Sequence, residues 1–462
     1  MKLQICGAAQ TVTGSCHLLT LEDNYKILLD CGLYQGNEDT LEDFNHQWFF
    51  NPADIDVLIL SHAHIDHCGR IPKLVNDGFK GKIYCTSATR DLAAIMLLDS
   101  AHIQETDTEY ESRKFRKTIK PLYTQIDAKN CLKYFRCVEY DNWFSVNENI
   151  KVLFSDAGHI LGAASVTLKI NENNKETMFG FSGDIGRYNR PILKDPAPMP
   201  ELDYFICEST YGGKTHEETP ESDEHFLKII YETCIAKGGK LIIPAFSVGR
   251  TQELLYRLDK LYTEGKLKNI PVYVDSPLAM NATEIFLIHP ECFDEEIYEY
   301  MRKDENPFGW NNMHYVKDAN QSKKLNVSDE ACIIIAASGM ANAGRVKHHL
   351  FHQLSNPNNT VLIVGYCAQG TLGQQLVDKP ETVNIFHQEI KVRASIEVMS
   401  SMSAHADQPE LLQFISNQDV NKLKKIFLVH GEPTKQEAYK SALLSKQYKS
   451  VEIPSLGEVF EL

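Results

Sequence analysis

The stretch His62-Ala-His64-Ile-Asp66-His67 directly follows an apolar run at residues 57–60. It places four side chains of metal-binding types on the loop that leaves a predicted strand. His62 and His64 lie two residues apart on nearly extended chain, so they project the same way and can share one ion. Asp66 and His67 can then serve a neighbouring ion, and the spacing favours two metals. The alternative is a polar loop with accidental histidines, and four side chains that can bind metal in one hexapeptide argue against it.

The chain around this loop reads mainly as short strands. The pattern predicts strands at 25–30, 56–60, 82–86, 151–155, 164–169 and 177–182. One long helix is predicted over residues 91–110, apolar near its start and polar and acidic later, so that its later part leaves the core. Residues 1–190 therefore predict a sheet-based domain.

A different pattern follows four prolines at positions 191, 196, 198 and 200, which mark a crossing into another domain. From about 209 to 390, helices alternate with apolar strands, and this alternation predicts a parallel α/β sheet. The expected helices are 221–236, 250–262, 277–288 and 345–353, and the expected strands are 240–243, 272–274, 332–336 and 360–364. Beyond 390 we expect a strand (392–398), a helix (409–415), a strand (425–429) and a helix (435–444).

Composition excludes several classes of protein. A chain of 462 residues with 43% hydrophobic and 24% charged residues is globular and long enough for two or three domains. No apolar run approaches the roughly 18 to 20 residues of a membrane span, and the N-terminus does not read as a secretory signal, so we expect a cytoplasmic protein without membrane contact. The 12 Cys include no C-x-x-C pair, which argues against a thiolate zinc ribbon and against a disulfide framework.

The H-x-H-x-D-H loop resembles the signature of the metallo-β-lactamase fold superfamily. The resemblance implies that His159, in Asp156-Ala-Gly-His159, completes the first zinc site. It also implies that Asp184, in Phe181-Ser-Gly-Asp184, bridges both ions and that Asp30 supports the metal loop. An anionic oxygen between two cations would screen their repulsion and fix their separation.

Three later residues resemble the motifs of the β-CASP nucleases, namely Glu208, His405 and His430, with the long insertion after the first of them. The resemblance implies that His430 completes the second zinc site with Asp66 and His67. It implies that His405 protonates the leaving 3′-oxygen, a role suited to an imidazole, and that Glu208 orients His405 and keeps it cationic. The motifs Gly249-Arg-Thr-Gln-Glu253 and Ser338-Gly-Met340 support the resemblance.

The resemblance implies a fold and an activity. The fold is a four-layered αββα sandwich from residues 1–208 and 391–462, with a parallel α/β β-CASP domain, residues 209–390, inserted between them. In this group, histidine at the position of His430 is typical of members that act on RNA. We therefore expect zinc-dependent hydrolysis of RNA phosphodiester bonds, endonucleolytic or from the 5′ end, leaving a 5′-phosphate. Two Zn²⁺ per chain are expected, and the His-rich ligand set also admits Mn²⁺.

The acidic net charge of −15 argues by itself against a polyanionic partner, but two bound divalent cations would create local positive potential. We expect single-stranded RNA to enter a cleft between the domains. Phosphate would meet backbone N–H groups of Ser338, Gly339 and Met340 and of residues 401–405, which include Ser403 and His405. The basic runs 112–120 and 422–425 are candidate backbone contacts, although such runs are often only solvated. A homodimer is possible.

Two other functions are compatible with the sequence. A small-molecule ester or thioester hydrolase could use the same metal centre, although the insertion and His405 argue against it. A catalytically silent RNA-binding subunit of a processing complex would be expected to lack metal ligands, and here all seven are present.

Overall fold

The computed structural model describes residues 1–35, 44–216, 223–365, 367, 370–399 and 403–462. The chain forms two compact units, one of Met1–Thr215 with His405–Leu462 and the other of His216–Ala404. The boundaries predicted from the sequence, after 208 and after 390, lie somewhat earlier along the chain in both cases. Each unit is described by itself.

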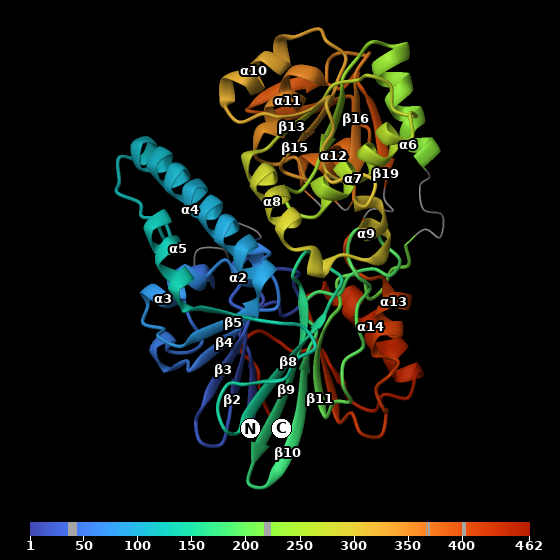
Figure 1. Cartoon of the computed structure of the whole chain (residues 1–462). Helices are drawn as coiled ribbons and strands as arrows, with labels where there is room; N and C mark the ends of the chain where they lie inside the picture. Colours follow the sequence, from blue (N-terminus) through green and yellow to red (C-terminus); the bar gives the residue numbers. More distant parts are fainter. Residues whose placement is uncertain (36–43, 217–222, 366, 368–369, 400–402) are drawn as a thin grey trace. The chain divides into compact units, whose positions relative to one another are not determined.

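The first sheet of the first unit has seven strands in the order β22-β1-β2-β3-β4-β5-β6. Their bounds are β1 Lys2–Ile5, β2 His17–Thr20, β3 Lys26–Leu29, β4 Val57–Ile59, β5 Lys82–Thr86, β6 Phe135–Val138 and β22 Val459–Glu461. Strands β3 to β6 are parallel, whereas β1 pairs antiparallel with both β2 and β22. The pairing of β1 with β22 brings the two ends of the sequence together (Figure 1).

The second sheet also has seven strands, in the order β21-β20-β11-β10-β9-β8-β7. Their bounds are β7 Phe144–Ser145, β8 Ile150–Asp156, β9 Ala164–Glu172, β10 Lys175–Phe181, β11 Tyr204–Glu208, β20 Lys425–Val429 and β21 Val451–Glu452. Strands β7 to β10 form an antiparallel meander, and β10, β11, β20 and β21 continue it in parallel. Parallel pairing puts the carboxyl ends of β10, β11 and β20 at one edge, and the candidate site lies there.

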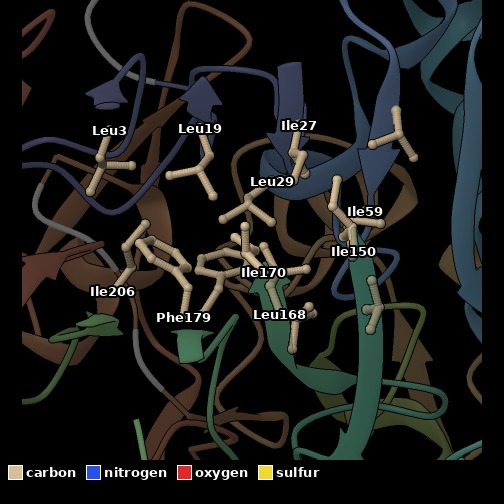
Figure 2. Packing of buried hydrophobic residues seen from close by; sticks show 14 of the residues in the cluster. Leu3, Leu19, Ile27, Leu29, Ile59, Ile150, Leu168, Ile170, Phe179 and Ile206 are labelled. Atoms are coloured by element: carbon tan, nitrogen blue, oxygen red, sulfur yellow. The ribbon is translucent and has the colours of Figure 1, made fainter. Parts of the chain in front are cut away.

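The two sheets pack face to face through their apolar inner faces. Alternate residues along each strand meet in this core, such as Ile27 and Leu29 of the first sheet against Leu168 and Phe179 of the second (Figure 2). Burying one such side chain contributes about 1.5 to 3 kcal/mol. Leu28 lies between Ile27 and Leu29 on β3 and points to the opposite face of the sheet. It is also fully buried, so the outer face of the first sheet is covered as well.

Helices provide the outer covers of the sandwich. The first sheet is covered by α2 Ile65–Cys68, α3 Ile71–Asn76, α4 Ser87–Phe115 and α5 Gln125–Cys131, and the second by α13 Gln408–Ile415 and α14 Pro433–Ser445 (Figure 1). Short 3₁₀ turns lie at Pro52–Asp54 (η1) and Leu132–Tyr134 (η2). The predicted αββα architecture is confirmed.

Helix α4 contains the helix predicted at 91–110 and is longer at both ends. Its buried side chains begin with Ala88 and end with Ala101, so the prediction that its later part leaves the core is correct.

The second unit contains a six-stranded parallel sheet in the order β14-β13-β15-β12-β16-β19. The strands are β12 Leu241–Pro244, β13 Val272–Asp275, β14 Met313–Tyr315, β15 Ile333–Ala336, β16 Thr360–Val364 and β19 Ser395–Met399, and a separate hairpin is formed by β17 Thr382–Ile385 and β18 Gln388–Lys391. The strand predicted at 392–398 corresponds to β19. The sequence pattern assigns this strand to the sandwich, but that assignment is wrong. β19 pairs with β16 in the sheet of the second unit, because the chain does not return to the first unit until His405.

The helices of the second unit connect its strands. They are α6 Asp223–Ile230, which continues as a π-helical segment η3 Tyr231–Ala236, α7 Arg250–Thr263, α8 Pro277–Ile288, η4 Pro290–Cys292, α9 Glu295–Met301, α10 Ala319–Val327, α11 Arg345–Gln353 and α12 Leu372–Val377. The helix predicted at 221–236 matches α6 and η3, and its first two residues lie outside the described residues. Within the described ranges, no helix has both the length and the apolar character needed to cross a membrane.

Candidate metal centre

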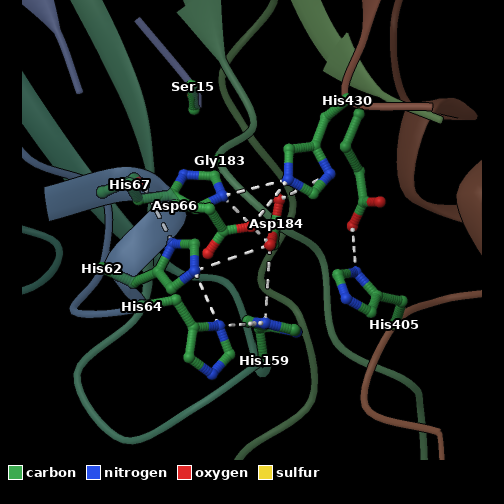
Figure 3. Close-up of polar contacts among 12 residues, drawn as sticks. Ser15, His62, His64, Asp66, His67, His159, Gly183, Asp184, His405 and His430 are labelled. Atoms are coloured by element: carbon green, nitrogen blue, oxygen red, sulfur yellow. Dashed lines mark hydrogen bonds and ion pairs between the residues drawn. The ribbon is translucent and has the colours of Figure 1, made fainter. Parts of the chain in front are cut away.

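The predicted metal ligands all lie on segments that leave strands of the sandwich at one edge. His62 and His64 follow β4, and the next turn, α2, carries Asp66 and His67. The others follow strands of the second sheet: His159 comes after β8, Asp184 after β10 and His430 after β20. Figure 3 shows these side chains pointing toward one another.

The first cluster consists of His62, His64, His159 and Asp184. Nδ1 of His64 lies 3.1 Å from Nε2 of His62 and 3.2 Å from Nε2 of His159. The Oδ2 atom of Asp184 lies 3.5 Å from Nε2 of His62 and 3.6 Å from Nε2 of His159. Three imidazole nitrogens and one carboxylate oxygen therefore face a common point.

The second cluster consists of Asp66, His67 and His430. Nε2 of His430 lies 3.3 Å from Nε2 of His67 and 3.4 Å from Oδ2 of Asp66. The Oδ2 atom of Asp184, which belongs to the first cluster, is also 3.2 Å from Nε2 of His67. One carboxylate oxygen is thus close to both clusters.

These spacings fit divalent ions with tetrahedral ligation. Ligand bonds of about 2.0 to 2.1 Å in a tetrahedron place neighbouring donor atoms about 3.3 Å apart. The donor atoms of each cluster lie 3.1 to 3.6 Å from one another across the measured pairs. Nitrogen and oxygen donors without cysteine suit zinc and do not fit a thiolate site.

The protonation of the first cluster also suits metal binding. Burial holds the pKa of His62 and that of His159 well below the ordinary value and lowers the pKa of His64 to about 4. Burial raises the pKa of Asp184, but the charges of His430 and His67 outweigh it and lower that pKa. Neutral imidazoles and an ionised carboxylate are the forms that bind a cation.

Asp30 belongs to neither cluster, but its carboxylate contacts residues of the histidine loop. Its buried carboxylate lies 2.6 Å from Nδ1 of His67 and accepts hydrogen bonds from the N–H and the hydroxyl of Ser61, both at 2.8 Å. Ser15 donates a longer bond of 3.3 Å. With Nδ1 of His67 held by Asp30, its Nε2 is left to face Asp184, an arrangement that fixes the orientation of a ligand.

Glu208 and His405 form a pair beside the first cluster. Nδ1 of His405 lies 3.4 Å from Oε1 of Glu208, and the ring centroids of His405 and His159 are 4.5 Å apart. The Glu208 carboxylate is buried and accepts hydrogen bonds from the N–H groups of Ile185, at 2.6 Å, and Thr210, at 3.3 Å. Burial lowers the pKa of His405, but the Glu208 carboxylate, together with those of Asp184 and Asp66, outweighs this effect and raises that pKa to about 9. The neighbouring carboxylates therefore favour the protonated ring.

The predicted substrate contacts lie in the second unit, apart from His405. Ser338, Gly339 and Met340 follow β15 at the carboxyl end of its sheet. The ring of Phe246 covers Gly339, and a Cβ there would meet ring carbons at 2.8 Å. Ser403 is buried, and residues 401 and 402 of the predicted amide cradle lie outside the described residues. Contact of these groups with phosphate stays a prediction.

The sequence interpretation missed the hydroxyl groups that hold the ligands. Ser61 Oγ lies 3.0 Å from Nδ1 of His62, and Thr210 Oγ1 lies 3.0 Å from Nδ1 of His430. Ser61 lies next to His62 in the sequence and Thr210 lies two residues after Glu208, and this closeness to site residues is the only signal that could have indicated them. Gly183 is required here, because its φ is +56° and a Cβ would lie 2.7 Å from Cβ of Ser61.

A sandwich of two sheets between helices, with a His- and Asp-rich centre at one strand edge, defines the metal-dependent hydrolases of the metallo-β-lactamase fold. Family models agree: residues 18–181 match the metallo-beta-lactamase superfamily domain, 251–376 the Beta-Casp domain and 389–454 the Zn-dependent metallo-hydrolase RNA specificity domain. The chain belongs to the β-CASP family of this superfamily, as its motifs indicated.

Proteins of known name resemble the chain along most of its length. It is 35% identical over 460 residues, covering 99% of both chains, to Ribonuclease TTHA0252 of Thermus thermophilus. It is 32% identical over 462 residues to an RNase J-like protein of Methanocaldococcus jannaschii, covering 99% of this chain and 98% of that protein. It is also 32% identical over 445 residues to the transcription termination factor FttA of the same organism, covering 94% of this chain and 67% of that protein.

Proposed function

We propose that the chain is a zinc-dependent ribonuclease that hydrolyses phosphodiester bonds of single-stranded RNA. The observation that carries the proposal is the pair of donor clusters with Oδ2 of Asp184 close to both, and with the Glu208–His405 pair beside them. Relatives named as a ribonuclease and as RNase J-like, each aligned over almost its whole length, support the choice of RNA as substrate.

In this proposal seven side chains hold two zinc ions. His62, His64 and His159 would hold the first ion, Asp66, His67 and His430 would hold the second, and Asp184 would contribute to both. When bound, zinc supplies Lewis acidity toward a phosphoryl oxygen and makes water a competent nucleophile at neutral pH. Asp30 holds the ring of His67 in place for this purpose through its 2.6 Å contact with Nδ1.

His405 serves as the general acid. Its imidazolium gives a proton to the 3′-oxygen as the bond from phosphorus to that oxygen breaks, so one product carries a 3′-hydroxyl and the other a 5′-phosphate. Glu208 does not touch the reacting atoms in this scheme. It positions His405 through the 3.4 Å contact and favours the protonated ring.

The test uses one RNA, labelled at the 5′ end or at the 3′ end, and the matching DNA. The zinc-loaded protein should cut RNA in preference to DNA, and product lengths separate internal cleavage from digestion from the 5′ end. His64→Ala should abolish cleavage, and His46→Ala, an exposed histidine outside the clusters, is the matched control. His405→Asn should slow cleavage with both ions retained.

Two results would replace this proposal. Turnover of lactones or thioesters without cleavage of RNA would favour a small-molecule hydrolase. RNA binding without hydrolysis, with less than one ion per chain after expression with zinc, would favour a silent RNA-binding subunit. A cytoplasmic location and a homodimer belong to the same proposal, and sedimentation of the zinc-loaded protein measures the latter.

A further inference from the structure

The distal end of helix α4 concentrates positive charge on an acidic protein. Five cationic residues, Arg113, Lys114, Arg116, Lys117 and Lys120, occur between Ser112 and Lys120, and that stretch has no acidic residue, whereas the whole chain has a net charge of −15. All five are exposed. We call residues 110–120 the basic tip.

Two large aromatic side chains are exposed within the same segment. Tyr110 is 66% exposed and Phe115 is 62% exposed. Nζ of Lys114 lies 6.0 Å from the centroid of the Tyr110 ring and 5.3 Å from that of Phe115, so the two rings flank one cation. Exposed aromatic rings that gain nothing from the core point to a surface that meets a partner.

The basic tip extends beyond the core of the first unit but has a defined conformation. The last buried residue of α4 is Ala101, so about 14 further residues, or about 21 Å of helix, continue past the core. Arg116 ends the helix in the left-handed region, with φ of 52°. The segment after the helix folds back onto its last turn, since the backbone N–H of Ile119 donates to Oγ of Ser112 at 2.9 Å.

Most of these cations are not neutralised by nearby carboxylates. Arg113 pairs with Glu109. Lys114, Arg116, Lys117 and Lys120 make no ion pair with a carboxylate among the residues that the structure describes. Five cations against the single carboxylate of Glu111 leave the tip with a net positive charge within an acidic protein.

We propose that the basic tip is a second RNA-binding surface, on which nucleobases stack against Tyr110 and Phe115 while the cations meet the phosphates. Single-stranded nucleic acid is bound by this combination, because every base has a face to stack and every phosphate a charge to neutralise. An acidic protein or an anionic membrane would use the charges, but it would not need two rings around one cation.

The other end of α4 is close to the metal centre. The hydroxyls of Thr86 and Thr89 both donate to the carbonyl oxygen of Gly162, at 2.7 and 2.8 Å, three residues after His159. From Ser87 to Phe115 the helix spans about 42 Å. A long RNA can reach both places and a very short one cannot, so the tip selects for length. This inference rests on the proposed function.

The experiment compares two full-length variants that each lose four positive charges. The tip variant replaces Lys114, Arg116, Lys117 and Lys120 with Gln, which leaves the Arg113–Glu109 pair intact. The control variant replaces the exposed lysines Lys82, Lys151, Lys175 and Lys446 with Gln. Binding of oligouridylates of about 40 and about 6 nucleotides is measured by fluorescence anisotropy with metal chelated, so that affinity does not depend on hydrolysis.

The tip variant should bind the long RNA at least about tenfold more weakly at 0.1 M salt. The logarithm of its association constant should also fall less steeply with the logarithm of the salt concentration, the slope being smaller by up to about 0.7 for each phosphate contact that is lost. Its binding and cleavage of the short RNA should equal those of the control. Tyr110→Ser with Phe115→Ser should weaken long-RNA binding at 1 M salt as well, because stacking is not screened.

Equal long-RNA affinity in the tip and control variants would overturn the inference. Unchanged RNA affinity with loss of binding to vesicles rich in phosphatidylserine would also overturn it, in favour of a membrane surface. If neither variant nor the parent protein cleaves RNA in zinc, the proposed function fails, and the binding comparison still decides whether the tip contacts RNA.

Discussion

Replacing Glu208 with Gln keeps the size of the side chain and one oxygen that can still accept from the N–H of Ile185, but it loses the acceptor for the N–H of Thr210 and removes the negative charge beside His405. That carboxylate raises the pKa of His405 to about 9, against the lowering effect of burial. Without it, burial is opposed only by the smaller effects of Asp184 and Asp66, and we expect the pKa to fall toward the ordinary value of about 6.5. Glu208→Gln should therefore move the alkaline limit of activity to lower pH by more than two units.

The sign of the change follows from the role of His405. A general acid must be protonated, so activity is present below its pKa and is lost as the pH rises through it. At pH 8 about nine tenths of the rings are protonated with a pKa of 9, but only about 3% with a pKa of 6.5. The variant should cleave RNA about thirtyfold more slowly than the parent at pH 8 and by a much smaller factor at pH 5.5.

The assay is single-turnover cleavage of a labelled RNA between pH 5 and 10 with saturating zinc. Glu437→Gln, an exposed carboxylate on α14, is the matched control and should keep the parent profile. Glu208→Asp should restore part of the shift. If Glu208→Gln and the parent lose activity over the same pH range, the electrostatic role of Glu208 is refuted.

Three further predictions concern metal and stability. His64→Ala removes the nitrogen that lies near both His62 and His159, so zinc content measured by mass spectrometry should fall by about one ion per chain. Asp30→Asn removes the anionic partner of His67 Nδ1. The affinity for zinc, measured by competition titration, should fall about 10- to 100-fold, while both ions still bind at high zinc concentration. An unchanged affinity would contradict the supporting role of Asp30. Leu168→Ala opens a cavity between the sheets and should destabilise the chelated protein by about 2 to 5 kcal/mol in urea unfolding, whereas the neighbouring Lys169→Ala should cost much less.

The sequence was informative where a local pattern carried the structure. The loop of the candidate clusters could be predicted because four side chains that can bind metal follow an apolar strand within a few residues. The motifs around His159, Asp184 and His430 indicated the other members of the clusters. The long helix was predicted correctly as well, including its exit from the core, because its apolar residues cluster near its start.

Long-range pairing could not be predicted from such patterns. Strand β19 has the same apolar character whichever sheet it joins, and only its pairing with β16 assigns it to the inserted sheet. The pairing of β1 with β22 joins residues from opposite ends of the sequence. The support of His62 by Ser61 depends on the position of Asp30 behind both, which local sequence does not reveal.

The position of His405 follows from how the insertion joins the sandwich. The chain leaves the first unit after Thr215 and re-enters it at His405. The re-entering segment is fixed at once, since Ala406 N–H donates to Ile185 O at 2.9 Å and Gln408 N–H donates to Lys214 O at 3.0 Å. The first of these bonds joins Ala406, the residue after His405, to Ile185, the residue after Asp184. The N–H of Ile185 in turn donates to the carboxylate of Glu208. His405 is thus held beside Asp184 and Glu208 by the backbone that closes the insertion, which explains how His405 and Glu208, 197 positions apart in the sequence, come to lie 3.4 Å apart.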